Sequence, residues 1–489
     1  MSKEIIDTDS KKDLKSKTLK GFFWRFGERI SSQAVSFIVS IVLARLLEPE
    51  DYGVVALTMV FMAIANSLAI SGLGSSLIQK KDADELDFST MFHAGLILSF
   101  VLYLILYITA PYIAIACHEE RVAPVLKVLG LMLPISSINS IQQAYVSRKL
   151  DFKKFFYATS IGTIISGVVG IIMAYCGYGV WALVGQQLTN SVVNTFTLNR
   201  IINWHPQWLF SFERLKELYS FGLKLMGSNL IGSISNQLKN IIVGVKYQPA
   251  DLAFFNRGEH IPHLIANNIN NTINAVLFPA ISKLQDDRSA VKNAIRRSVM
   301  TSTFVMVPIM FLIAVTSDKI VIILLTKKWL PCVPFMQVLC INCCLEILGT
   351  ANLQTFNALG RSDITLKLEF VKKPIYLLII LTAMYYSPLA IAIGCCIYSF
   401  ISTAINAWPN KNLINYSLVE QVKDVLPQFL IGIIMAVVIY LVGFLDVNIY
   451  LMLIVQIIIG VVVYWSLSVF FSLESYRYFW DNIKFIKKN

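Results

Sequence analysis

The sequence predicts an all-α integral membrane protein with about 14 transmembrane helices, arranged as two pseudo-symmetric six-helix lobes plus two C-terminal helices. Three observations predict this fold class. The 489 residues are 56% hydrophobic and only 15% charged, whereas soluble domains carry roughly a quarter charged residues. Apolar runs long enough to span a bilayer follow one another along the chain, and similar motifs recur in its two halves. This composition excludes a cytosolic enzyme, a secreted disulfide scaffold and a nucleic-acid-binding module.

The predicted spans are apolar stretches separated by short loops that hold most of the Lys and Arg residues. In order, they cover about 21–47, 52–78, 88–116, 122–147, 153–175, 178–199, 215–244, 250–281, 295–316, 331–359, 364–386, 388–409, 424–445 and 447–472. Spans one, seven, eight and ten contain many polar residues, which usually face protein or a hydrated cavity because lipid cannot hydrogen-bond them. We therefore expect a bundle with a wet interior.

The charge distribution predicts that both termini are cytoplasmic. When the spans alternate from a cytoplasmic start, about 30 of the 42 Lys and Arg residues fall on the inner side and about six in outer loops. The predicted organisation is a cytoplasmic tail (1–20), an N-lobe (21–210), a C-lobe (211–411) and a final segment (412–489) with helices 13 and 14 and a cytoplasmic tail.

The two predicted lobes carry matching motifs. In the first half, Phe26-Gly27 opens a polar helix and the EPEDYG turn follows from Glu48. Roughly 200 residues further on, Phe221-Gly222 opens another polar helix and the QPADLAFF turn follows from Gln248. Such repeats place a substrate site between the halves, near the membrane midplane. The alternative is chance recurrence of helix–Pro–helix patterns.

Several positive charges fall within predicted spans, where each costs at least about 2.5–3.5 kcal/mol unless it is paired or hydrated. The candidates for binding a diphosphate are Arg25, Arg29, Lys224, Lys239 and Arg257. Arg offers bidentate donors to phosphate and Lys a point charge. The alternatives are that Arg25 and Arg29 extend to the cytoplasmic headgroups, and that Glu259 simply neutralises Arg257.

Amide side chains line one face of predicted span eight. They are the candidates for binding a glycan, because amides both donate and accept hydrogen bonds as sugar hydroxyls require, and they are Asn267, Asn270, Asn271 and Asn274. The alternative is that such amides hold helices together, at about 0.6 kcal/mol per bond.

The sequence shows no clear catalytic or metal centre. Cys340 and Cys343 form a CxxC with Cys344 adjacent, but no second pair follows. Glu259, His260 and His263 are close in sequence, yet Pro262 is expected to break the helix there, which favours a polar kink over a metal site. Because no nucleotide-binding or nucleophile motif is present either, we predict no metal, no cofactor and no enzymatic activity.

Four stretches resemble Wzx-type polysaccharide flippases, the polysaccharide transporter branch of the multidrug/oligosaccharidyl-lipid/polysaccharide exporter superfamily. They are the first-helix FG, ARLLEPEDYGVVAL (44–57), QPADLAFFNRG (248–258) and FPAISKL (278–284). The resemblance covers essentially the whole chain. It implies that the protein moves an undecaprenyl-diphosphate-linked oligosaccharide across a bacterial plasma (inner) membrane by alternating access, for surface polysaccharide biosynthesis such as lipopolysaccharide or exopolysaccharide.

The resemblance also bears on individual residues. Related lipid II flippases use Arg in the first helix, Asp and Arg around the second, and Arg in the eighth; Arg25 or Arg29, Asp51 and Arg257 occupy similar positions here. Span two departs from that pattern because it has serines but no Arg. Asp51 and Asp251 are alternatively caps of the helices that follow them.

The sequence does not distinguish whether transport is driven by coupling to H⁺ or Na⁺ or by the membrane potential. The ion-coupling candidates are Glu28, Glu259 and Glu346. Expected partners are membrane lipids, a polysaccharide polymerase and a chain-length regulator. Two alternative functions remain: a multidrug/cation antiporter of the same superfamily, which would need an acidic cavity, and a membrane polysaccharide polymerase or glycosyltransferase, which would need a sizeable outer loop.

Overall fold

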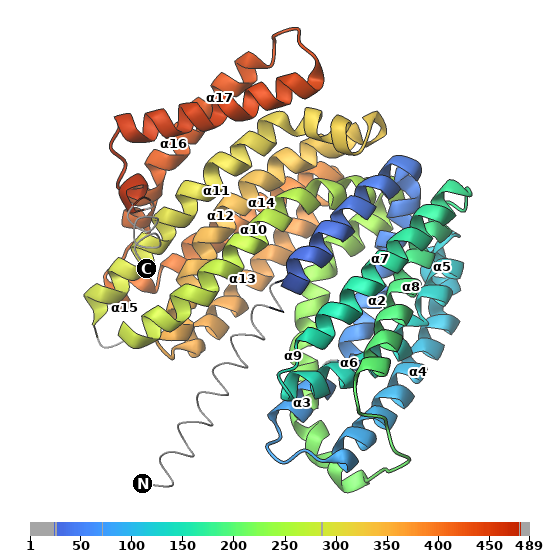
Figure 1. The fold of residues 1–489 in the computed structure, drawn as a ribbon. Helices are drawn as coiled ribbons and strands as arrows, with labels where there is room; N and C mark the ends of the chain where they lie inside the picture. Colours follow the sequence, from blue (N-terminus) through green and yellow to red (C-terminus); the bar gives the residue numbers. More distant parts are fainter. Residues whose placement is uncertain (1–23, 25–26, 71, 285–286, 479, 481–489) are drawn as a thin grey trace. The chain divides into compact units, whose positions relative to one another are not determined.

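The computed structural model consists of α-helices and describes Trp24 and residues 27–70, 72–284, 287–478 and 480 (Figure 1). No β-strand occurs in these ranges. The predicted tail 1–20 and Arg25 lie outside the described residues, as do the side chains of Lys224 and Asn274. The chain forms two compact units, Met1–Ala253 and Phe254–Asn489. The predicted lobe boundary at residues 210 and 211 stays a prediction.

The first unit is built on helices that pack around α2. Its elements are the helix Gly27–Leu46, α2 (Pro49–Ile70), α3 (Leu73–Gln79), α4 (Glu85–Ala116), α5 (Val122–Leu129), α6 (Met132–Arg148), α7 (Lys153–Tyr175), α8 (Val180–Ile201), α9 (Phe212–Lys246) and the start of α10 (Pro249–Leu284). Helix α2 contacts α5, α6 and α9, while α7 runs along α8 (Figure 1).

The second unit is built around α11 and α12. Its elements are the remainder of α10, α11 (Arg288–Leu324), the 3₁₀ helix η1 (Lys327–Cys332), α12 (Val333–Ala358), α13 (Ser362–Ala383), α14 (Pro388–Ala407), α15 (Asn410–Ile414), α16 (Leu418–Val442) and α17 (Ile449–Phe470). Helix α11 packs against α12, α16 and α17, and α12 packs against α14.

Helix boundaries follow local capping chemistry. The Asp84 side chain accepts a hydrogen bond from the Asp87 backbone N–H, and the Asp87 side chain accepts one from the Asp84 backbone N–H, so that α4 starts with a capping box. Ser417 and Glu420 form the same box at the start of α16. Predicted span two is divided instead, because Gly72 adopts a φ of +93° between α2 and α3, a conformation that glycine adopts without steric cost.

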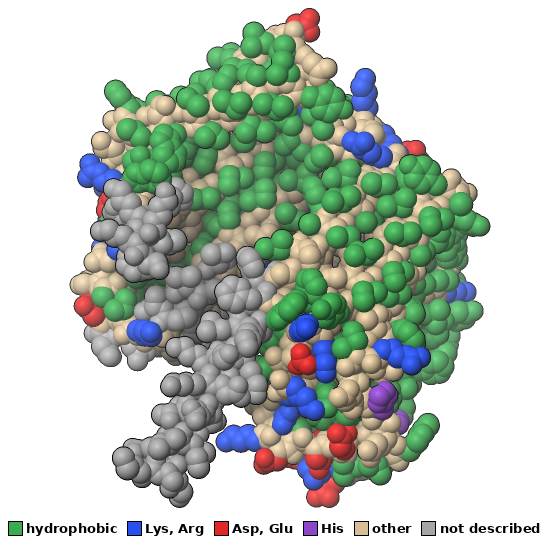
Figure 2. Space-filling model, viewed as in Figure 1, with side chains coloured by type: hydrophobic (Ala, Val, Ile, Leu, Met, Phe, Trp, Pro, Cys, Tyr) green, Lys and Arg blue, Asp and Glu red, His purple; other side chains and the backbone are tan. Residues whose placement is uncertain are grey.

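Within the described residues, every predicted span coincides with a helix or a pair of consecutive helices, as expected for a multi-pass membrane protein. Ten helices among the described residues are long and apolar enough to cross a bilayer. The other four predicted spans coincide with α8, α9, α10 and α13, which have at least 22 residues each but are more polar. The total of fourteen therefore stays a prediction. Apolar side chains cover the flanks of the helices, and many charged ones gather at helix ends (Figure 2).

Small residues allow α7 and α8 to approach closely. The buried face of α7 repeats a small side chain every fourth residue, at Ala158, Gly162, Ser166, Gly170 and Ala174. This small-xxx-small pattern lets membrane helices pack backbone to backbone. A Cβ atom at Gly170 would lie 2.9 Å from the Cβ of Gln186 on α8. The amide-rich face of α8 therefore packs against the face of α7 that carries these small residues.

Candidate functional site

A polar cavity of about 280 Å³ lies inside the first unit, next to α6 and α8. Apart from Ile70 of α2, its lining consists of uncharged hydroxyl and amide side chains, namely Ser136, Asn139, Ser140, Gln143, Asn190, Ser191, Asn194 and Thr195. Its volume is close to the lower end of ligand pockets, about 300 Å³. Side chains that both donate and accept suit an uncharged, hydroxyl-rich ligand such as a sugar.

The amides of α8 have two roles in this arrangement. The Nδ2 of Asn190 donates to the Ser166 hydroxyl of α7 at 3.2 Å, so it joins two helices. Asn190 and Asn194 also line the cavity. The cavity could not be predicted from the sequence because its polar lining comes from two separate helices. The spacing of polar residues along α6 and α8 was the available signal.

The predicted diphosphate-binding cations are divided between the two units. In the first unit, Arg29 is exposed on the helix Gly27–Leu46, and Lys239 is half-buried on α9. In the second unit, Arg257 is half-buried on α10, with its guanidinium carbon 5.5 Å from the centroid of the Trp329 ring. Such a cation–π contact stabilises a partly desolvated cation. Arg25 and the side chain of Lys224 lie outside the described residues.

The predicted glycan-binding amides lie along α10. Asn267 and Asn271 are exposed and Asn270 is half-buried, whereas the side chain of Asn274 is not among those described. An exposed amide on a spanning helix requires water or protein beside it, because lipid offers no hydrogen-bonding partner. These positions suit a hydrated surface.

The expectation that Pro262 breaks the helix is wrong. Helix α10 continues from Pro249 to Leu284 through Pro262. Proline lacks an N–H, so the Gly258 carbonyl cannot receive its usual intrahelical hydrogen bond from residue 262. Membrane helices tolerate this loss when neighbouring groups compensate. The continuous helix keeps Glu259 and His263 one turn apart on the same face.

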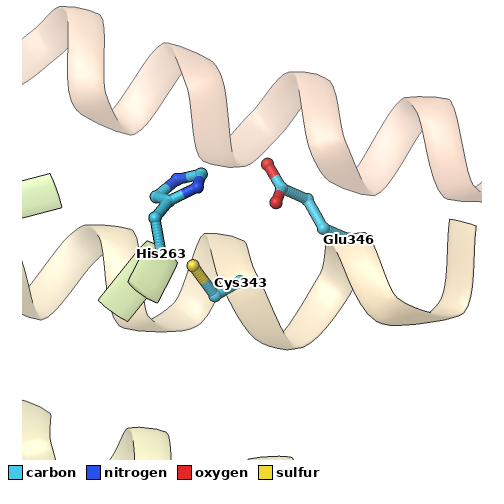
Figure 3. Close-up of side chains that lie close together, drawn as sticks. All are labelled: His263, Cys343 and Glu346. Atoms are coloured by element: carbon cyan, nitrogen blue, oxygen red, sulfur yellow. The ribbon is translucent and has the colours of Figure 1, made fainter. Parts of the chain in front are cut away.

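A cluster of ionisable and polar side chains joins α10 and α12 within the second unit (Figure 3). The Glu259 carboxylate lies 3.2 Å from His263 Nε2. The donor atoms of His263, Cys343 and Glu346 all lie within 4.8 Å of one another. Two predicted ion-coupling residues, Glu259 and Glu346, are thus connected through His263. The third, Glu28, is half-buried in the first unit.

Hydrogen bonds from α12 and α14 extend this cluster. Asn342 Nδ2 donates to Glu346 Oε1 at 2.8 Å, and the Ser399 hydroxyl of α14 donates to Asn342 Oδ1 at 2.6 Å. The sequence places Glu259 and His263 close together, but it does not connect them with Glu346 or Cys343 of α12. The i, i+4 spacing of Glu259 and His263 was the available signal for half of the cluster.

Ion pairs at helix ends use charges that the sequence analysis predicts to be cytoplasmic. In the first unit, the Lys80 ammonium contacts Asp87 at 3.0 Å and Glu217 at 2.9 Å. Burial alone would lower the pKa of Lys80, but these two carboxylates outweigh it and raise that pKa. In the second unit, Arg296 pairs with Asp424 at 2.8 Å and Glu474 at 2.7 Å. These pairs join helix ends and leave no evident ligand site.

Comparison with known proteins identifies several relatives. A family model described as "Polysaccharide biosynthesis protein" matches residues 42–334. The succinoglycan biosynthesis transport protein ExoT of Rhizobium meliloti (strain 1021) is 21% identical over 319 residues, which is 65% of each chain. The teichuronic acid biosynthesis protein TuaB of Bacillus subtilis (strain 168) is 24% identical over 75% of this chain and 77% of its own length. The lipopolysaccharide biosynthesis protein WzxC of Escherichia coli (strain K12) is 21% identical over 80% of each chain.

Two kinds of solved structure share the fold. An inward closed conformation of the lipid II flippase MurJ aligns with a TM-score of 0.73 and 15% identity, covering 93% of this chain and 99% of its own. An inward-facing multidrug resistance transporter of the MATE family aligns with a TM-score of 0.60 and 15% identity, covering 79% of this chain and 98% of its own. At these identities the likeness establishes the fold alone.

Proposed function

The chain belongs to the polysaccharide biosynthesis protein family, and from this premise we propose that it is a flippase for lipid-linked oligosaccharides. Its substrate is an undecaprenyl-diphosphate-linked oligosaccharide. The protein carries this substrate from the cytoplasmic to the outer leaflet of a bacterial plasma membrane, and both of its termini are cytoplasmic. The family match carries the proposal, because the fold is shared by flippases and by multidrug transporters.

The names of the relatives support this substrate class. They connect those proteins to succinoglycan transport and to the biosynthesis of teichuronic acid and lipopolysaccharide. The polar, uncharged cavity of the first unit adds physical support, since hydroxyls and amides match the hydrogen-bonding groups of a glycan.

Each part of the substrate requires a different protein surface. In our proposal Arg25, Arg29, Lys224, Lys239 and Arg257 supply the cations that bind the diphosphate. The amides Asn267, Asn270, Asn271 and Asn274 of α10, together with the cavity beside α8, contact the glycan. The prenyl chain stays in lipid, because burying it in a polar cavity would forfeit its hydrophobic stabilisation.

Translocation by this mechanism is a conformational cycle without a covalent step. The two lobes, residues 21–210 and 211–411, alternate between inward-open and outward-open states, and residues 412–489 accompany them. Glu28, Glu259 and Glu346 are the candidates for coupling the cycle to H⁺ or Na⁺. A polysaccharide polymerase and its chain-length regulator act on the product in the outer leaflet.

The proposal can be tested with purified protein in liposomes that contain a defined undecaprenyl-diphosphate oligosaccharide. Access of the glycan to an external lectin or glycosidase reports its translocation. We expect Arg29→Ala and Arg257→Ala each to slow translocation about 10- to 100-fold, because a hydrogen bond to a charged group contributes about 1.5–3 kcal/mol. Arg361→Ala is the matched control, since Arg361 is an exposed cation paired with Asp363.

Other outcomes would contradict specific parts of the proposal. Wild-type rates in both variants would refute the role of these cations. Export of organic cations without movement of the lipid-linked substrate would favour the multidrug antiporter. Formation of new glycosidic bonds by the purified protein would favour a polymerase.

A further inference from the structure

Three side chains of different chemistry converge inside the second unit, at the cluster between α10 and α12 (Figure 3). They are the imidazole of His263, the thiol of Cys343 and the carboxylate of Glu346, and their donor atoms lie within 4.8 Å of one another. Cys343 and Glu346 are one turn apart on α12, and that spacing places both on one face of the helix. We propose that these three side chains form a binding site for a single borderline-soft divalent metal ion, of which Zn²⁺ is the best fit.

The spacing of the donors is compatible with zinc. Zinc bonds of about 2.0–2.3 Å to nitrogen, oxygen and sulfur place tetrahedral ligand atoms roughly 3.5 Å apart. The present separations of up to 4.8 Å exceed this by about 1.3 Å at most, which small side-chain rotations can supply. Three protein ligands leave a fourth position for water.

Neighbouring side chains hold one of the three ligands and lie within reach of a second. The Glu259 carboxylate lies 3.2 Å from His263 Nε2, a buried nitrogen that has no hydrogen-bond partner among the described residues. A small rotation of the imidazole would let Glu259 accept its N–H, as carboxylates do beside metal-bound histidines. Asn342 holds Glu346 through a 2.8 Å hydrogen bond, and Ser399 holds Asn342 in turn. A ligand set oriented in this way loses less entropy when it binds a metal.

The backbone holds α10 against the start of α12, beside the cluster. A Cβ atom at Gly258 would lie 2.7 Å from the Cβ of Phe335 and 2.9 Å from the Cys332 carbonyl oxygen. Glycine therefore permits a backbone approach that a larger residue would prevent. His263 lies little more than one turn beyond this contact, so it projects from a helix segment whose distance to α12 is set.

Charge and donor type select the metal. A thiolate and a carboxylate together neutralise a divalent cation, which matters because Cys343 is fully buried and an uncompensated charge there is costly. Sulfur and imidazole donors favour zinc over Ca²⁺ and Mg²⁺, which prefer oxygen ligands. His263 and Glu346 are only half-buried, and this leaves a path for the ion to enter.

The site would connect α10 to α12 and would occupy Glu346. A bound metal would therefore leave Glu28 and Glu259 as the ion-coupling candidates of the proposed transport cycle. The metal proposal itself does not depend on the flippase function, because it rests only on the geometry of these side chains.

The test uses the full-length protein in lipid nanodiscs, with Zn²⁺ and Co²⁺ as probes. Metal content after dialysis is measured by mass spectrometry, and cobalt substitution reports a cysteine ligand through its thiolate-to-cobalt charge-transfer band. We expect one ion per chain and a clear band for the wild type. Cys343→Ser and His263→Ala should lose both, while Glu259→Gln should weaken binding about 10- to 100-fold.

The matched control is Cys344→Ser, which removes a neighbouring buried thiol on the same helix outside the ligand set. It should keep both the ion and the band. The proposal fails if the wild type binds no metal, if Cys343→Ser retains the band, or if Cys344→Ser loses the ion equally. Thermal unfolding of each metal-free variant shows whether a loss of metal binding arises from misfolding. If it does, the milder Glu259→Gln variant decides the outcome, because unchanged metal binding in that variant would contradict the proposal.

Discussion

Gly53 on α2 lies directly against the backbone of Pro249, the first residue of α10. A Cβ atom at residue 53 would be 1.9 Å from the Pro249 carbonyl oxygen. Each residue belongs to one of the two matching turn motifs, EPEDYG and QPADLAFF. In both motifs Pro is the first residue of a helix, where its missing N–H costs nothing. The two corresponding turns of the sequence repeat therefore contact each other.

Gly53→Ala is expected to destabilise the protein strongly. The clash involves backbone on both sides, so rotation of a side chain cannot relieve it, and overpacking of this kind costs about 1–3 kcal/mol or more. Thermal unfolding in detergent would measure the loss. Gly232→Ala is the control, because a Cβ there meets no atom within 4 Å; an equal melting temperature for Gly53→Ala and wild type would contradict the prediction.

A second prediction concerns a buried pair of amides in the second unit. Asn352 Nδ2 donates to Gln421 Oε1 at 2.9 Å, and Gln421 Nε2 donates to Asn352 Oδ1 at 3.0 Å. A double-mutant cycle with Asn352→Ala and Gln421→Ala should give a coupling energy of about 0.6–1.7 kcal/mol. Reversible unfolding in mixed micelles is the measurement. The control is a second cycle that combines Asn352→Ala with Gln354→Ala, since Gln354 is a half-buried amide on α12. Its coupling energy should be near zero.

Acid should destabilise the second unit through Glu474. The hydrogen bond from Arg296 holds the pKa of Glu474 below its ordinary value of 4.5. A carboxylate with a lowered pKa in the folded state stabilises the protein above its unfolded pKa, and this contribution is lost as pH falls through the folded pKa. Stability should therefore drop below about pH 4.5, and Glu474→Gln should make that drop smaller.

The control for acid sensitivity is Glu213→Gln, which changes an exposed carboxylate in the first turn of α9. The melting temperature of this variant, measured from pH 7 to pH 3, should change with pH in parallel with that of the wild type. A Glu474→Gln profile that also runs parallel to the wild type would contradict the assignment.

The polar cavity predicts a defect that depends on the glycan. Thr195→Val and Ser140→Ala remove hydroxyls from its lining with little change in volume. Each should slow translocation of a lipid-linked oligosaccharide about fivefold, because a neutral hydrogen bond contributes about 1 kcal/mol. Undecaprenyl diphosphate without a glycan should be unaffected. Val192→Ala, on an exposed position of α8, is the control, and equal slowing of both substrates would refute a glycan site.

The positions of the helices could be predicted because each requires only local information. An apolar run bounded by charges identifies a spanning helix, and Pro49 and Pro249 mark helix starts by the same chemistry. Interruptions were harder to foresee. Gly72 divides α2 from α3, whereas Pro262 leaves α10 intact, because the packing around a helix determines whether a breaking residue ends it.

The membrane class, the succession of helices, the recurrence of the Pro-containing turns and the residue types available for the proposed lipid-linked substrate follow from the amino-acid sequence alone. Which polar residues contact one another became evident from the folded arrangement. The amides of α8 pack on the small face of α7 and line a cavity with α6, while His263 joins Cys343 and Glu346. This difference arises because helical periodicity fixes which residues share a face of one helix, whereas the partner of that face depends on packing between segments far apart in the chain.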